Sequence, residues 1–150
     1  MKNKNISLLT SLLTPLPLDM KKSSARRRFL RHIKGFKEDY DLEGEEIRKK
    51  YSEKNADGGH KTVKDIIQFS FENRKKADAD FLKLNDLEIE IDWSGEEADK
   101  EIMKDVVQNE YDKLFILTEA EKEAGLKEKE LNDNVFEFSE TLLEIISELK

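Results

Sequence analysis

Apolar and small residues recur every three or four positions from Ala25 to Tyr51, and this spacing constrains the fold more than any other feature of the chain. The separations are 4, 4, 3, 4, 4, 3 and 4, and the residues are Ala25, Phe29, Ile33, Phe36, Tyr40, Gly44, Ile47 and Tyr51. A period near 3.6 is that of an α-helix with one buried stripe. The spacing therefore predicts one long helix over residues 24–53. Gly44 lies on the stripe, where a close approach of another helix would explain a glycine.

Composition favours thin helices with narrow contacts over a thick globular core. The chain has 150 residues, of which 41% are charged and 37% hydrophobic. This is rich in charge, but the strong periodicity of the apolar residues argues against disorder. The length fits a single domain. We expect it to comprise an N-terminal docking segment over 1–18, the long helix over 24–53, a small β region with a short helix over 58–93, and C-terminal helices over 95–149.

A leucine-rich segment precedes the long helix. Apolar residues from Ile6 to Leu13 have helical spacing, and Pro15 and Pro17 end that helix. A helix of about two turns is unstable alone in water, so its leucines dock on the rest of the fold or on another subunit. Leu9 and Leu12 are therefore candidate contact residues.

The same segment has some features of a signal peptide, namely two lysines followed by leucines. The prolines interrupt the apolar run, and no small-residue cleavage motif follows it. No apolar run approaches the ~20 residues of a membrane-spanning helix. The sequence therefore predicts a soluble, cytoplasmic protein without a membrane partner.

Two stretches in the middle of the chain alternate between apolar and polar residues. The first is 65–73, with Ile67, Phe69 and Phe71, and the second is 85–93, where apolar residues alternate with acids. Alternation of this kind is typical of half-buried strands. Turn-forming residues occupy 55–60, and a short helix capped by Asn73 is expected over 74–84. Two strands are marginal alone, so the long helix is expected to cover them.

The C-terminal third returns to helical spacing. One helix starts after Gly95 and breaks near Leu117, where the sequence from Thr118 to Glu121 forms a capping box. A last helix runs from Asp133 to about Leu149, with its buried stripe beginning at Leu131. The predicted fold class is α+β, mainly α. The long helix and the C-terminal helices would pack around a small two- or three-stranded antiparallel sheet.

Charge is strongly segregated along the chain. Residues 1–37 carry a net charge of +9, residues 38–150 carry −16, and the whole chain carries −7. Three interpretations are open. The basic stretch contacts an acidic partner protein, or a nucleic acid, or it is a solvated face neutralised by acidic elements of its own chain or a neighbouring copy. The acidic total and the absence of a nucleic-acid-binding motif weigh against nucleic acid.

The candidate partner-binding residues are the cations of the basic stretch and two leucines of the preceding segment. Arginines in the first turns of a helix oppose its dipole, so a compensating partner is plausible on physical grounds. The residues are Lys21, Lys22, Arg26, Arg27, Arg28, Arg31, Lys34, Leu9 and Leu12.

Catalytic and metal-binding patterns are missing from the sequence. There is no cysteine, and the two histidines, His32 and His60, have no second histidine at metal-ligand spacing. No phosphate-binding or nucleophile motif occurs. The acids Glu88, Glu90 and Asp92 would share a strand face, which is better explained by solvation than by a cation. The sequence predicts a protein that is not an enzyme and uses no cofactor or metal, and it favours a core position for Trp93.

Three short motifs occur in the first sixty residues. They comprise Leu16, Pro17 and Leu18, then Lys22, Ser24, Ala25, Arg26 and Phe29, then Tyr51, Glu53, Asp57 and Gly58. In these motifs the chain resembles a family of small uncharacterised proteins from tailed bacteriophages and prophages. The resemblance implies a phage-encoded, cytoplasmic, non-enzymatic protein and carries no catalytic residues.

Taken with the charge segregation, this resemblance leads to three functional hypotheses. The main one is a phage-type protein that binds or inhibits a host or defence protein through a basic helix face. The first alternative is a homo-oligomer with a structural or assembly role in a phage particle. The second alternative is a nucleic-acid-binding accessory protein.

Overall fold

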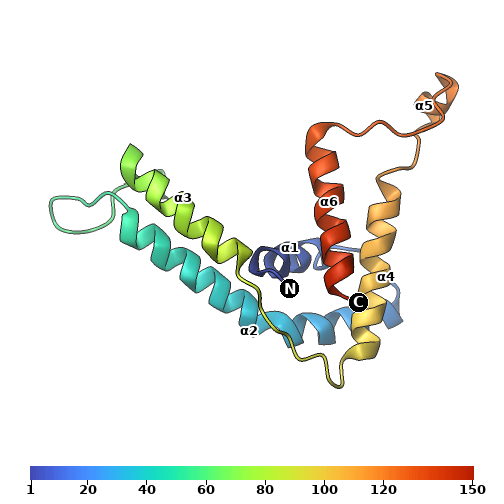
Figure 1. The fold of residues 1–150 in the computed structure, drawn as a ribbon, viewed down its shortest axis with the longest axis horizontal. Coiled ribbons are helices and arrows are strands. Elements are labelled where there is room, and N and C mark those ends of the chain that lie inside the picture. The colour runs from blue at the N-terminus through green and yellow to red at the C-terminus, as the bar shows by residue number, and fades with distance from the viewer. The chain divides into compact units, whose positions relative to one another are not determined.

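The computed structural model describes all residues from Met1 to Lys150 and is mainly helical (Figure 1). It also contains one small antiparallel sheet of two strands. This confirms the predicted fold class. The elements in chain order are α1 (Asn3–Leu13), α2 (Met20–Tyr51), β1 (Thr62–Val63), β2 (Ile66–Ile67), α3 (Phe71–Asp86), α4 (Glu97–Lys113), α5 (Glu119–Glu123) and α6 (Asp133–Glu148).

The chain forms two compact units, and their boundaries fall inside α1 and α2. The first unit comprises residues 1–11 and 33–90, and the second comprises 12–32 and 91–150. The long helix predicted over 24–53 is present as α2, which begins four residues earlier and ends two residues earlier than expected.

In the first unit, the second half of α2 lies beside α3 (Figure 1). Tyr40 donates a hydrogen bond to Asn85 at 2.8 Å, and Tyr51 donates to Asp80 at 2.7 Å. Between these bonds Gly44 is buried, and a Cβ placed on it would lie 3.7 Å from Cε1 of Phe81. Phe81 of α3 therefore lies near Gly44, but an alanine there would make only an ordinary van der Waals contact, so the close approach that would explain a glycine is not found. The buried apolar residues of this unit are Ile6, Leu9, Ile33, Ala77 and Leu84.

The sheet is smaller than the sequence suggested. β1 and β2 are two residues each, and Thr62 pairs with Ile67 and Val63 with Ile66. Their side chains are exposed except at Ile67, which is half-buried. The expectation that the long helix covers this sheet is therefore wrong. The turn predicted over 55–60 is present, with Gly58 at a φ of +85°.

Phe71 begins a helix instead of ending a strand. Ser70 is the N-cap of α3, because its hydroxyl accepts a hydrogen bond from the backbone N–H of Asn73 at 3.2 Å. The cap predicted at Asn73 is thus three residues too late. Phe71 then projects into solvent with 76% of its surface exposed, so the alternation through Phe69 and Phe71 was a wrong indication of a strand.

The second expected strand, near Ile89, is an extended segment that pairs with only a few residues at the start of the chain. Backbone N–H groups of Asn3 and Ile89 donate to Leu87 and Met1 at 3.0 and 2.8 Å, and Lys2 bridges to Glu88. Only the first three residues of the chain pair with this segment. It therefore keeps the extended conformation that alternation predicts without forming a strand.

In the second unit, α4 and α6 pack side by side (Figure 1). The capping box is confirmed, since the hydroxyl of Thr118 accepts from the N–H of Glu121 at 3.2 Å. Asn132 caps α6, since its side chain accepts a hydrogen bond from the N–H of Val135. The buried apolar residues of this unit are Leu13, Ala25, Phe29, Met103, Val106, Val107, Leu142, Ile145, Ile146 and Leu149. No helix anywhere in the chain has the length and apolarity needed to cross a bilayer.

Candidate functional site

The candidate site consists of the basic residues in the first half of α2. Because these residues point in different directions around the helix, their side chains have different neighbours. Successive residues of an α-helix are rotated by about 100° because there are 3.6 residues per turn. Arg26, Arg27 and Arg28 therefore cannot share one face. Each of the three has a different set of contacts.

Arg26 points back toward the end of α1. Its Nη1 donates to the carbonyl oxygens of Leu13 at 2.9 Å and Thr14 at 3.2 Å, and it also contacts that of Leu16. The last carbonyls of a helix have no partner within the helix, so a cation that binds them acts as a C-terminal cap. This explains one arginine of the basic stretch by a structural role.

Arg28 forms a bidentate ion pair with Asp99 of α4. Its Nε and Nη2 each lie 2.7 Å from one carboxylate oxygen of Asp99, whose side chain is 9% exposed. The hydrogen bond from this guanidinium holds the pKa of Asp99 below its ordinary value, although burial of the carboxylate opposes the shift. Geometry of this kind is among the stronger polar contacts in proteins. The role of Arg28 is therefore also internal.

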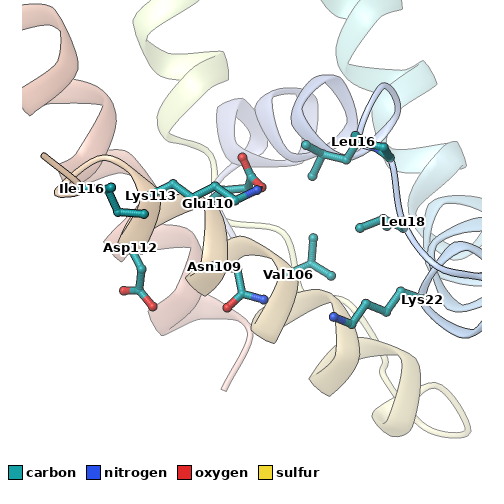
Figure 2. Close-up of a pocket in the computed structure, with 10 residues that line it drawn as sticks. Leu16, Leu18, Lys22, Val106, Asn109, Glu110, Asp112, Lys113 and Ile116 are labelled. Atoms are coloured by element: carbon teal, nitrogen blue, oxygen red, sulfur yellow. The ribbon is translucent and has the colours of Figure 1, made fainter. Parts of the chain in front are cut away.

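Lys22 lies in the wall of a groove of about 400 Å³ between the α1–α2 connection and α4 (Figure 2). Leu16 and Leu18 line the same side, with Val106 of α4 opposite. Lys113 at the far side is paired with Glu110 at 2.7 Å. Since Lys22 lies seven residues before the buried Phe29, it is on the inward side of α2, away from Arg27 and Arg31.

Arg27 and Arg31 project from the opposite side of α2. Both are exposed, and neither guanidinium lies within 4 Å of a carboxylate oxygen. The only side-chain contact of Arg27 is with the hydroxyl of Ser24 at 3.3 Å. Met20, 87% exposed, lies two turns before Arg27 and three turns before Arg31 on the same side of the helix. We call Met20, Arg27 and Arg31 the outer face of α2.

The remaining predicted contact residues are divided between solvent and core. Lys21 is exposed, and Lys34 is paired with Glu38 at 3.4 Å. Leu12 is half-buried. Leu9 is completely buried, so its inclusion among surface contact residues is corrected here. Of the two possibilities for the leucines of this short helix, docking on the rest of the fold or on another subunit, Leu9 shows the first.

Neither histidine belongs to a cluster of potential metal ligands. The Nε2 of His32 lies 2.6 Å from the carbonyl oxygen of Asp92, and its ring packs against Trp93. Trp93 itself stacks on the buried Phe29, with ring centroids 5.3 Å apart. His60 contacts the hydroxyl of the buried Ser52. The rings of His32 and Trp93 therefore have a packing role, whereas His60 makes hydrogen-bond contacts with Ser52 and Lys54.

One surface was missed by sequence reasoning. Phe136 and Leu143 of α6 are 55% and 40% exposed and lie on a flank of that helix, about 100° around it from the buried Leu142. Their separation of seven residues places them two turns apart on one face. That separation is visible in the sequence, but the dominant stripe through Leu142 and Ile145 concealed it.

No protein-family model, curated protein or solved structure matches the chain. The resemblance to phage proteins therefore stays a prediction.

Proposed function

We propose that this chain is a non-enzymatic protein that acts by binding an acidic surface of another protein through the outer face of α2. The observation that supports this is the state of Arg27 and Arg31. They remain exposed and unpaired in a chain whose formal charge is −7, whereas Arg26 and Arg28 are used internally. Exposed cations of this kind accelerate association with an acidic partner and orient it.

The proposal includes a setting. The partner is a host or defence protein, and the site of action is the cytoplasm of a bacterial host, as the phage resemblance implies. Nucleic acid is the competing polyanion. It would need its phosphates to approach a chain of net negative charge, and its binding would weaken steeply with salt because counterions are released.

The test is a titration of two labelled probes, poly-L-glutamate and a short DNA duplex, followed by fluorescence anisotropy at several salt concentrations. We expect wild type to bind poly-L-glutamate and the Arg27→Glu/Arg31→Glu variant to lose at least about tenfold in affinity, equivalent to ~1.4 kcal/mol. Lys75→Glu/Lys76→Glu on α3 makes the same change in net charge at other exposed positions and is expected to bind like wild type.

Equal loss in both variants would mean that only net charge matters, and the proposal would fail. Tighter binding of DNA than of poly-L-glutamate at every salt concentration would instead support the nucleic-acid alternative.

A further inference from the structure

The exposed side of α6 combines two apolar side chains with unpaired acids. Phe136 and Leu143 lie two turns apart, and Glu140 is between them on the same stripe. Glu137 is one turn from Glu140 along the helix, and both are exposed. Neither carboxylate has a lysine or arginine nitrogen within 4 Å. We call Phe136, Glu137, Glu140 and Leu143 the acidic face of α6.

The charge of α6 limits what can cover this face. The helix carries five acids and no lysine or arginine, namely Asp133, Glu137, Glu140, Glu144 and Glu148. Pairing of this face with the same face of another copy would bring like charges together, which opposes association. The occupant that fits is a helix face with cations and an apolar residue.

The outer face of α2 has this chemistry. Arg27 and Arg31 are one turn apart, with Cβ atoms about 5–6 Å from each other, and the same spacing separates Glu137 from Glu140. The exposed Met20 supplies an apolar contact, and arginine also packs its guanidinium over aromatic rings such as that of Phe136. The two faces are thus complementary in charge, spacing and polarity.

We propose that the acidic face of α6 binds the outer face of α2 of a second copy of this chain. Because the two contacting surfaces differ, the contact is heterologous, so each copy keeps one face open and assembly continues into rings or filaments. This inference rests on the proposed function in that both require the outer face of α2 to be a binding surface. An acidic partner protein would therefore compete with self-association.

Two variants that each lack one face test this contact by sedimentation velocity. Arg27→Glu/Arg31→Glu reverses the charge of the outer face of α2, and Phe136→Ser/Leu143→Ser removes the two apolar side chains of the acidic face of α6. The substituted side chains are exposed or largely so, and thermal unfolding followed by circular dichroism establishes that each variant is folded.

We expect the sedimentation coefficient of wild type to rise with protein concentration and to fall with added salt. Each variant alone stays monomeric. An equimolar mixture forms a one-to-one complex and nothing larger, because only one productive pair of faces remains. A monomeric wild type at all concentrations overturns the inference, as does self-association of either variant or a mixture that stays monomeric.

The poly-L-glutamate titration distinguishes this failure from failure of the proposed function. Phe136→Ser/Leu143→Ser keeps the outer face of α2, so it still binds the probe if only the self-association is wrong. If wild type does not bind poly-L-glutamate, the proposed function is contradicted.

Discussion

Arg28 and Asp99 lie 71 residues apart in the chain and are joined by two hydrogen bonds of 2.7 Å each. This contact fixes the start of α4 against the first half of α2. The helix dipole does not disfavour Arg28 as the sequence suggested, because α2 begins at Met20 and Arg28 lies in its third turn, beyond the reach of the dipole at the N-terminus.

Asp99→Asn removes the charge and keeps the shape of the side chain. We expect the free energy of unfolding at neutral pH to fall by about 1–3 kcal/mol, the range for a charged hydrogen bond lost at a desolvated site. Chemical denaturation measures this. Glu101→Gln is the matched control, since it weakens an exposed pair with Lys104 and is expected to lower the free energy of unfolding by much less than Asp99→Asn does. Equal effects of the two substitutions would contradict a special role for Asp99.

The same ion pair makes stability depend on acid pH. The pKa of Asp99 is lowered in the folded protein by the hydrogen bond from Arg28, so the unfolded chain binds this proton first as the pH falls. The stabilisation is present above the pKa of an unfolded aspartate, about 3.9, and is lost as the pH falls through the lower folded value. Denaturation curves at pH 7 and pH 3 should therefore show the Asp99→Asn deficit shrinking at pH 3. A deficit that is unchanged at pH 3 would exclude this linkage.

Gly35→Ala and Gly44→Ala should each stabilise the protein. No atom lies within 4 Å of a Cβ placed on Gly35, and the nearest atoms to one on Gly44 are at 3.7 Å. Both lie inside α2, where glycine is less favourable than alanine by about 0.5–1 kcal/mol. Gly58→Ala is the control and should destabilise, because its φ of +85° strains any other residue. Thermal unfolding measures all three. A loss at Gly44 would show that α2 and α3 pack more tightly there.

Arg26→Met should lower the free energy of unfolding by about 1 kcal/mol, because the carbonyls at the end of α1 lose their donor. Its neighbour offers a direct comparison. Arg27→Met removes an arginine whose only side-chain partner is Ser24, and its effect should stay within about 0.5 kcal/mol. Urea denaturation separates the two. Indistinguishable variants would contradict the capping role of Arg26.

Helices were predictable from the sequence because their signals are local. The period through Ala25 and Phe29 sets the buried side of α2, and the hydroxyl of Thr118 needs only the next turn to act as a cap. Strand prediction was correct only at β2, which lies in the first alternating stretch, and it failed elsewhere for the opposite reason. Alternation of apolar and polar residues is a property of a single segment, whereas a strand forms only where a second segment pairs with it. The residues near Ile89 pair only with the first residues of the chain.

For the candidate site as well, the sequence did not reveal contacts between distant parts of the chain, and the basic stretch is an example. Helical rotation already implies that consecutive arginines diverge, but the sequence does not say which of them meets a partner. Arg28 is neutralised by an acid 71 positions away, and Arg26 by carbonyls of an earlier helix. Only the fold leaves Arg27 and Arg31 as the unpaired pair. The buried Leu9 is a further case, since amphipathic spacing alone does not distinguish packing within a fold from packing between subunits.

The central claim is that the outer face of α2 recognises an acidic protein surface, and capture from a bacterial lysate with quantitative mass spectrometry tests it most directly. Wild type, Arg27→Glu/Arg31→Glu and Lys75→Glu/Lys76→Glu are immobilised in parallel. The account predicts an acidic protein that is retained by wild type and by the α3 variant, is lost from the α2 variant, and binds again when purified. An identical set of proteins on all three baits, or no protein that depends on Arg27 and Arg31, would contradict it.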